Sequence, residues 1–239
     1  MAISKPAIEP QVTTSTGLKF VLATIVLLLS VNTVSSIYAL GWKSAIATTS
    51  FVLLLDVLYV AKTRDRALLG WIVFGLAAGV AELVADAWLV RTGTLIYPTD
   101  EPMLWDSPAY MPIAWAIVLV QIGYLSTWLC ERMPRLKAAV ATALLAGVNI
   151  PIYEHLADGA GWWHYVETPM LLSAPYYVIV AEFMLALPLA FWAASIVRGK
   201  LSRAALLGIA EGGVMLAAVV IAFRLVGPCS GALLQLPCP

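Results

Sequence analysis

Residues 68–90 read LLGWIVFGLAAGVAELVADAWLV, an apolar stretch in which Glu82 and Asp86 are the only charged side chains. A helix of this length, rising about 1.5 Å per residue, crosses the roughly 30 Å hydrocarbon core of a bilayer. Gly75 and Gly79 form a G-x-x-x-G pattern, which lets a neighbouring membrane helix approach closely. The stretch therefore predicts a tightly packed transmembrane helix that carries acid inside the membrane.

The rest of the chain has the same character. Of its 239 residues, 62% are hydrophobic and 12% are charged, and soluble domains carry roughly 25% charged residues. Glycine, proline and charged residues divide the chain into seven apolar stretches, residues 18–40, 42–61, 68–90, 108–130, 136–157, 173–197 and 204–226. We therefore expect an all-α integral membrane protein. It would form one seven-helix domain over residues 18–226, between a polar N-terminal tail, 1–17, and a short C-terminal tail, 227–239.

Basic residues predict the orientation, because short loops rich in lysine and arginine stay in the cytoplasm. The seven spans would place eleven of the fourteen basic residues on one side, namely Lys5, Lys19, Lys62, Arg64, Arg66, Arg132, Arg135, Lys137, Arg198, Lys200 and Arg203. Lys43, Arg91 and Arg224 fall on the other side. We expect a cytoplasmic N-terminus and an external C-terminus in a bacterial inner membrane. Cys229 and Cys238 would then lie outside, where they could form a disulfide.

Composition also bears on partners and cofactors. The net charge is zero, so no basic face is available to neutralise nucleic-acid phosphates. Two histidines are too few for a histidine-cluster iron site, and the three cysteines have no C-x-x-C spacing. We expect no metal and no redox cofactor. The expected partners are membrane lipid and a hydrophobic small molecule.

The chain contains a short internal repeat. The pattern E-x-x-A-D occurs at residues 82–86 and again at 154–158, near the ends of two spans that run in the same direction. Each copy is followed by a loop with aromatic residues and then by serine, proline and tyrosine at the start of the next span, residues 107–110 and 173–177. This predicts two helix pairs related by an axis along the membrane normal, with a shared cavity between them.

The spacing places several acids at one depth. Aligning Pro108 with Pro175 sets Trp115 against Glu182. The helical rise puts Glu82 and Trp115 about 10 Å below the outer surface and Glu182 about 13 Å below it. A charged side chain at mid-bilayer costs on the order of 3 kcal/mol, so such acids face the bundle interior. These three side chains are therefore expected to share a layer.

An acid in an apolar pocket can keep its proton and act as a general acid, while tryptophan and tyrosine rings stabilise a developing cation. This combination suits protonation of an isoprenoid alkene or epoxide. The candidate catalytic residues are Glu82, Glu182, Glu154, Asp86 and Asp158. The candidate substrate-binding residues are Trp115, Tyr110, Tyr177, Trp162, Trp163, Tyr153 and Asn149. Asp56 and Glu211 are expected in a different layer. The alternative is that the acids only join helices through hydrogen bonds.

Three prolines bear on the shape of the bundle. Pro112, Pro151 and Pro188 are expected to kink the spans that contain them and so to open a cavity between those spans.

In size, span number and intramembrane acids, the chain resembles the small heptahelical membrane terpene cyclases of meroterpenoid biosynthesis. The resemblance implies proton-initiated cyclisation of a polyprenyl or epoxy-polyprenyl chain without metal or redox cofactor. It implies a catalytic glutamate in the third span, where Glu82 stands. For the second acid, Glu182, Glu154 and Glu211 compete.

The stretches from Glu82 to Trp115 and from Glu154 to Pro188 are also similar to membrane carotenoid hydratases. The segment Gly159-Ala160-Gly161-Trp162-Trp163 corresponds to the loop of that family, whereas residues 93–97 contain less glycine. Here the resemblance implies the same protonation step followed by addition of water.

The function expected from the sequence is therefore that of a terpene cyclase. Glu82 would be the general acid, Glu182 or Glu154 its partner or the terminating base, and Asp86 and Asp158 would tune them. A carotenoid or isoprenoid hydratase is the alternative with the same first step. A proton-coupled carrier or a lipid-binding membrane subunit is the alternative of another class.

Overall fold

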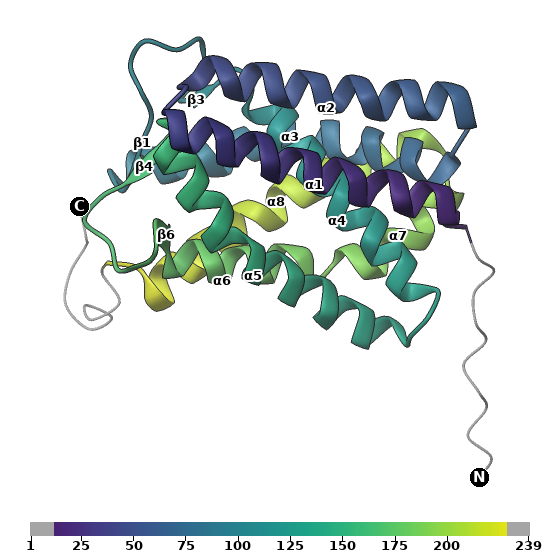
Figure 1. Cartoon of the computed structure of the whole chain (residues 1–239). Coiled ribbons are helices and arrows are strands. Elements are labelled where there is room, and N and C mark those ends of the chain that lie inside the picture. The colour runs from purple at the N-terminus through teal and green to yellow at the C-terminus, as the bar shows by residue number, and fades with distance from the viewer. Residues whose placement is uncertain (1–11, 229–239) are drawn as a thin grey trace.

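The structure, a computed structural model, describes residues 12–228, which form a bundle of α-helices with six two-residue strands gathered at one end (Figure 1). The helices are α1 (Ser15–Tyr38), α2 (Trp42–Thr63), α3 (Arg66–Arg91), α4 (Met111–Cys130), α5 (Arg135–Ala160), α6 (Tyr176–Ala186), α7 (Leu189–Arg198) and α8 (Leu201–Val226). The strands are β1 (Leu95–Ile96), β2 (Met103–Leu104), β3 (Ser107–Pro108), β4 (His164–Tyr165), β5 (Met170–Leu171) and β6 (Ala174–Pro175). Cys229 and Cys238, with their expected disulfide, lie outside the described residues.

Within the described part of the chain, six helices are long and apolar enough to cross a membrane: α1, α2, α3, α4, α5 and α8. Each begins and ends within three residues of a predicted span. Helices α6 and α7 are shorter and meet at a bend of 45°. Together they have the length and composition of one further span. The chain therefore has the architecture of a multi-pass membrane protein.

The prolines act differently at the three positions. The expected bend at Pro188 is present, because a proline ring clashes with the preceding turn and offers no N–H to continue the ladder. The expected kink at Pro112 was wrong, because Pro112 lies in the first turn of α4, where a helix needs no N–H donor. Pro151 lies inside α5, which runs unbroken from Arg135 to Ala160. Proline thus divides only the sixth predicted span.

The two ends of the bundle differ in structure and charge. All six strands lie at one end, which we call the strand end (Figure 1). The opposite end holds the connections α2–α3, α4–α5 and α7–α8 together with the start of α1, and we call it the basic end. The basic residues at that end are Lys19, Lys62, Arg64, Arg66, Arg132, Arg135, Lys137, Arg198, Lys200 and Arg203. Lys43, Arg91 and Arg224 are at the strand end.

The internal repeat is visible in the fold. In each copy, a helix is followed by a single strand, a two-stranded hairpin and a second helix. The first copy is α3-β1-β2-β3-α4 and the second is α5-β4-β5-β6-α6. Strands β1 and β4 pair antiparallel, with Leu95 opposite Tyr165 and Ile96 opposite His164, as two copies related by a twofold axis would. The hairpins also match, since β2 pairs with β3 and β5 pairs with β6.

The two hairpins agree in backbone detail. Pro102-Met103-Leu104 and Pro169-Met170-Leu171 are identical in sequence. Trp105 and Leu172 occupy equivalent turn positions and both have left-handed backbone, with φ of 61° and 56°. In each copy, the carbonyl of the proline before the hairpin accepts a hydrogen bond from the first backbone N–H after the hairpin. Ala109 donates to Pro102 at 2.8 Å, and Tyr176 donates to Pro169 at 3.1 Å. These repeated details support the alignment of Pro108 with Pro175.

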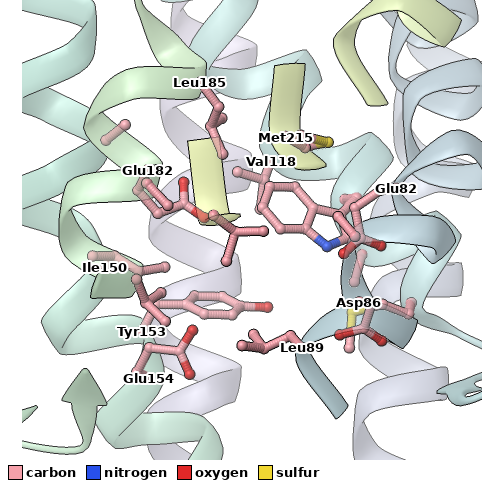
Figure 2. A pocket seen from close by; sticks show the side chains of 18 of the residues that line it. Glu82, Asp86, Leu89, Val118, Ile150, Tyr153, Glu154, Glu182, Leu185 and Met215 are labelled. Atoms are coloured by element: carbon pink, nitrogen blue, oxygen red, sulfur yellow. The ribbon is translucent and has the colours of Figure 1, made fainter. Parts of the chain in front are cut away.

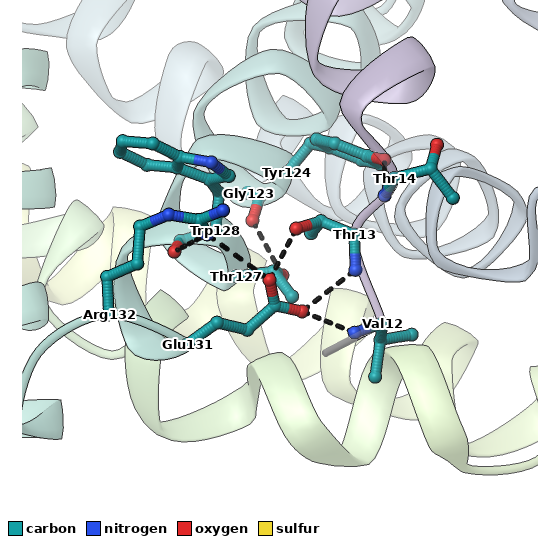
Figure 3. Close-up of polar contacts among 9 residues, drawn as sticks. All are labelled: Val12, Thr13, Thr14, Gly123, Tyr124, Thr127, Trp128, Glu131 and Arg132. Atoms are coloured by element: carbon teal, nitrogen blue, oxygen red, sulfur yellow. Dashed lines mark hydrogen bonds and ion pairs between the residues drawn. The ribbon is translucent and has the colours of Figure 1, made fainter. Parts of the chain in front are cut away.

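The residues on either side of helix α1 are hydrogen-bonded to the ends of two other helices, α4 at the basic end and α5 at the strand end. At the basic end, the Glu131 carboxylate after α4 accepts hydrogen bonds from the backbone N–H groups of Val12 and Thr13 at 2.5 and 2.8 Å (Figure 3). The Thr13 hydroxyl also donates to it. At the strand end, the Gly41 N–H donates to the Ala160 carbonyl at 2.8 Å. Helix α1 therefore runs from the end of α4 to the end of α5.

Helix α3 lies in the centre of the bundle and packs most closely against α8 and α4. A β-carbon built on Gly75 would lie 2.7 Å from the Ala116 carbonyl oxygen, closer than van der Waals contact. A β-carbon built on Gly79 would lie even closer to the carbonyl oxygen of Pro112 on α4. The G-x-x-x-G pattern thus allows α3 and α4 to touch backbone to backbone, which brings Glu82 and Trp115 to the same region.

Candidate functional site

The candidate site is a cavity in the strand-end half of the bundle, between α3, α4, α5, α6 and α8. Its empty volume is about 1150 Å³, including open space at its mouth. Four carboxyl side chains line it: Glu82 and Asp86 from α3, Glu154 from α5 and Glu182 from α6. All four residues are buried, with 4–7% of their surface exposed. The helix pairs of both repeat copies therefore contribute acid to one shared cavity.

The acids come from opposite walls. Figure 2 shows Glu82 and Asp86 on one side of the cavity and Glu154 with Glu182 on the other. Glu82 and Asp86 are four residues apart, so they stack one turn apart on the same face of α3. Glu154 occupies the position in the second copy that Glu82 occupies in the first. The repeat thus sets equivalent glutamates on facing walls.

The four carboxyls differ in their hydrogen-bond partners. Asp86 accepts bonds from the Tyr97 hydroxyl on both oxygens, at 2.8 and 3.0 Å. Glu154 accepts from the Trp163 indole at 2.5 Å. Glu82 lies within hydrogen-bonding reach of the Trp115 indole, and its other oxygen has no partner among the described residues.

Glu182 is the exception among the four acids. It lines the cavity without a hydrogen bond from any residue in the described range. Glu182 also lies within electrostatic range of Glu82 across the cavity. A carboxyl without a donor is the best placed of the four to interact directly with a bound molecule.

Tyr97 and Tyr165 come from the loops at the strand end and close the site on that side. Burial raises the pKa of both phenols well above the usual value, with nearby carboxyls as further causes. Tyr97 therefore stays protonated and remains a hydrogen-bond donor to Asp86. The rings of Tyr97 and Tyr153 lie 6.4 and 6.2 Å from the Trp163 ring, centroid to centroid. Three aromatic rings thus form a cluster beside the acids.

Away from the acids the cavity is apolar. Its lining runs along α4 from Met111 to Ile122, a distance of about 16 Å by helical rise. The lining of α6 runs from Val178 to the first residue of α7, Leu189. The end away from the acids is formed by side chains such as Ile122, Leu185 and Leu189. The cavity therefore has one acidic, aromatic end and one hydrocarbon end.

The structure brings together eight of the twelve residues that the sequence singled out. Those that line the cavity are Glu82, Glu182, Glu154, Asp86, Trp115, Trp163, Tyr153 and Asn149. Asp158, Tyr110, Tyr177 and Trp162 do not line it.

Each of these four side chains is placed elsewhere for a definite reason. Asp158 lies exposed at the last turn of α5 and accepts a hydrogen bond from Ser173 in the β5–β6 turn at 2.7 Å. The Trp162 indole donates to the Gly41 carbonyl and to Ser44, both at 3.0 Å, and so joins α2 to α5. Tyr177 is hydrogen-bonded to Thr94 at 2.8 Å. Tyr110 is buried beside Glu101, outside the cavity.

Other lining residues were missed by the sequence reasoning. Tyr97 and Tyr165 were noted only as loop aromatics, and Leu95 and Met215 were not considered. The pairing of β1 with β4 brings the two tyrosine-bearing loops together, and the sequence gives no local signal for a two-residue ladder. Gly208 and Gly212 on α8 pack against α3, and Met215 follows at the i+7 position on the same helical face, so this spacing could have pointed to Met215.

Two further buried acids lie outside the cavity lining. Asp56 on α2 is 1% exposed and Glu211 on α8 is fully buried. Their carboxyl oxygens have no hydrogen-bond partner among the described residues. Glu211 lies one turn from Met215 on α8 and within electrostatic range of Glu182. In residues 12–228, no group of three or more histidine, cysteine, aspartate or glutamate side chains is arranged to hold a metal ion.

Comparison with known families gives one match. The model of a family described as a domain of unknown function, DUF6989, matches residues 83–226. The matched segment runs from the last turns of α3 to the end of α8 and leaves α1 and α2 outside. It therefore contains most of the internal repeat, which spans α3 to α6. No curated protein and no solved structure matches the chain.

Proposed function

We propose that this chain, which belongs to the family of the domain of unknown function DUF6989, is a membrane enzyme that protonates an isoprenoid alkene or epoxide and guides cyclisation of the resulting cation. The observation that carries the proposal is the cavity itself. It combines four carboxyls and an aromatic cluster at one end with a hydrocarbon-lined space at the other. An isoprenoid needs both parts, one for its reacting double bond and one for its chain.

Glu82 and Glu182 are the proposed acids that face the substrate. In the first step, the carboxyl proton of Glu82 forms a C–H bond with one alkene carbon, and the π electrons of that alkene leave a cation on the other carbon. A second alkene of the chain then closes the ring. Loss of a proton to a carboxylate, Glu182 or Glu154, restores a double bond and ends the sequence. No oxidant or reductant is required, and proton uptake equals proton release.

The surroundings suit these roles. Tyr97 donates to both oxygens of Asp86 and so holds this carboxyl group close to Glu82. A carboxylate there would stabilise positive charge in the cavity. The faces of Trp115, Trp163 and Tyr153 add cation–π stabilisation while excluding water. These side chains would hold the cation long enough for ring closure.

The cavity length bears on the substrate. About 16 Å is roughly half the thickness of a bilayer hydrocarbon core. A short polyprenyl chain attached to a polar or aromatic group therefore fits better than a molecule that spans the bilayer, which would have to project from the cavity. This length favours a cyclase of short isoprenoids over a carotenoid hydratase.

We propose further that α6 and α7 form one broken span, which gives seven spans in all. The basic end then lies in the cytoplasm, in keeping with the ten basic residues described there, and the strand end faces outward. The acidic end of the cavity would open towards the outer face of a bacterial inner membrane. A polar substrate head would sit near that face and its chain deeper in the bilayer.

The proposal is tested with membranes that contain the chain, supplied with farnesylated or geranylgeranylated aromatic compounds and their terminal epoxides. Products are identified by mass spectrometry, which separates cyclised products, isomeric with the substrate, from hydrated ones that gain the mass of water. Glu82→Gln and Glu182→Gln should each reduce product formation by about 100-fold or more. Asp158→Asn is the matched control, since Asp158 lies outside the cavity.

The outcomes separate the candidate functions. Activity that survives both glutamine variants would refute the proposed acids. Hydrated products alone would favour the hydratase. Membranes inactive on every isoprenoid, but able to dissipate a proton gradient in vesicles in a Glu82-dependent way, would favour a proton-coupled carrier.

A further inference from the structure

A second polar cluster lies at the strand end, next to the cavity but outside it. It consists of Glu101, just before β2, Ser107 in β3, and Tyr110, the residue that precedes α4. Glu101 is 6% exposed, Tyr110 3% and Ser107 not at all. Three polar side chains are thus buried in a loop region that has no part in the cavity lining.

The partners of this cluster lead inward to the site. The Tyr110 hydroxyl lies close to the Glu101 carboxyl and within electrostatic range of Asp86 and Tyr153. Ser107 lies close to Asp86. None of the polar side-chain oxygens of Glu101, Ser107 and Tyr110 completes a hydrogen bond of normal geometry to a described residue. Buried polar atoms of this kind usually bond to ordered water. A hydrogen-bonded water can pass a proton from one such group to the next.

Charges around the cluster suit proton exchange near neutral pH. Burial, and then the neighbouring charge of Asp100, raise the pKa of Glu101 to about 7, while Tyr110 opposes the shift. The other charged group near Asp86 on this side, Asp106, is paired with Arg91 at 3.0 Å. A carboxyl that titrates near 7 can both take up and release a proton under physiological conditions.

The second copy of the repeat lacks this arrangement. Thr168 stands at the position of Glu101 and Ala174 at that of Ser107, as the alignment of Pro102 with Pro169 and of Pro108 with Pro175 requires. Tyr177, the counterpart of Tyr110, is hydrogen-bonded to Thr94. The buried acid, the serine and the unbonded tyrosine therefore occur together only beside Asp86.

We propose that Glu101, Tyr110 and Ser107 form a proton path between the solution at the strand end and Asp86 in the cavity. In one transfer, the Glu101 carboxyl gives its proton to the Tyr110 oxygen as the Tyr110 hydroxyl proton passes, through Ser107 or water, to the Asp86 carboxylate. Tyr110 is unchanged, Asp86 gains a proton, and Glu101 is reprotonated from solution. The path rests on the proposed function only for the use of the proton, which passes from Asp86 to Glu82, its neighbour one turn away, and replaces the proton that Glu82 has given to a substrate.

The path can be tested without a substrate, by infrared spectroscopy of the protein reconstituted in lipid films. Protonated buried carboxyls give C=O stretching bands, and Glu82→Gln, Asp86→Asn and Glu182→Gln assign those of the cavity. On change from H₂O to D₂O these bands shift, and the rate of the shift measures proton access. Glu101→Gln and Tyr110→Phe should each slow the shift by about tenfold or more.

The second copy supplies matched controls. Glu167→Gln and Tyr176→Phe make the same chemical changes at exposed positions of the other hairpin and should exchange at the wild-type rate. Circular dichroism and melting temperature show whether each variant is folded, and either Glu101→Gln or Tyr110→Phe alone is sufficient for the test. Wild-type rates in the folded variants would overturn the path. A wild-type protein with no exchanging cavity carboxyl band would also overturn it.

The experiments distinguish a failure of the proton path from a failure of the proposed enzymatic function. Slow exchange in both variants, in a protein that converts no isoprenoid, would support the path and count against the proposed function. Cyclisation by the wild type together with unchanged exchange in both variants would refute the path and leave the function intact.

Discussion

A single methyl group at Gly75 should separate the helices that hold Glu82 and Trp115. The β-carbon of an alanine at this position would lie 2.7 Å from the Ala116 carbonyl oxygen. Ordinary contact requires about 3.5 Å, so α3 and α4 must move apart locally by about 0.8 Å. Because Ala116 contributes a backbone carbonyl oxygen and the alanine β-carbon has no rotamer, no side-chain rotation relieves the clash. Gly75→Ala therefore tests whether the close approach of α3 and α4 supports the site.

The expected magnitudes follow from this displacement. Overpacking of this kind costs about 1–3 kcal/mol, and the better helix propensity of alanine returns up to about 1 kcal/mol. We expect a net loss of about 1–2 kcal/mol in the free energy of unfolding. Gly75 is seven residues from Glu82, about 10 Å along α3. A shift approaching 1 Å at the reacting groups lowers catalytic rates by up to about 100-fold.

The assay compares Gly75→Ala with Gly213→Ala, since a β-carbon on Gly213 meets nothing within 4 Å. Unfolding is followed by circular dichroism in mixed micelles of increasing denaturing detergent, and activity by product formation from the best isoprenoid substrate. Gly213→Ala should match the wild type in both. If Gly75→Ala is as stable and as active as Gly213→Ala, the argument from close helix packing is refuted.

Three further predictions concern substitutions of single acidic side chains. Asp86→Asn should lower the rate of product formation at least about tenfold, and Asp158→Asn should lower it less than about twofold. The difference is expected because Asp86 lines the cavity and Asp158 does not. The raised pKa of Glu101 means that folding favours its protonated form, so its contribution to stability is lost as pH rises from about 4.5 through 7. Glu101→Gln should therefore increase the free energy of unfolding at pH 8.5 by on the order of 1 kcal/mol after solvent screening, observed as a higher melting temperature, and leave both unchanged at pH 4.5. Glu131→Gln weakens three hydrogen bonds to residues 12 and 13 and should cost about 1–2 kcal/mol in detergent unfolding without changing the infrared carboxyl bands of the cavity.

Much of the helical architecture could be predicted, because bilayer thickness dictates the length of an apolar run. Residues 68–90 were expected as a span and occur within α3, Arg66–Arg91. The sequence did not distinguish a proline that starts a helix from one that breaks it. Pro112 and Pro188 both follow apolar residues, and their effects differ because Pro112 is in a first turn whereas Pro188 interrupts a continuing span.

Convergence of the acids could also be predicted, since depth and helical face follow from residue spacing alone. Glu82 and Glu182 were expected in one layer, and both line the cavity. Side chains near helix ends were harder to place. Asp158 was expected beside the other acids, but it lies outside the cavity lining, where Ser173 of the β5–β6 hairpin donates a hydrogen bond to it at the end of α5. Tyr97 reaches Asp86 only because the loop is held by the β1–β4 pairing, a contact between residues about 70 positions apart that no local pattern encodes.

The mutual pairing of β1 with β4 has an evolutionary consequence. A ladder in which each strand faces its own counterpart is the contact made by two identical subunits about a twofold axis. Two copies of a short ancestral chain, each a helix pair joined by a strand and hairpin, could have enclosed the same space as a homodimer. Gene fusion would then have freed the halves to diverge. The halves now differ at aligned positions, with Trp115 in one and Glu182 in the other, so the walls of the cavity are no longer identical.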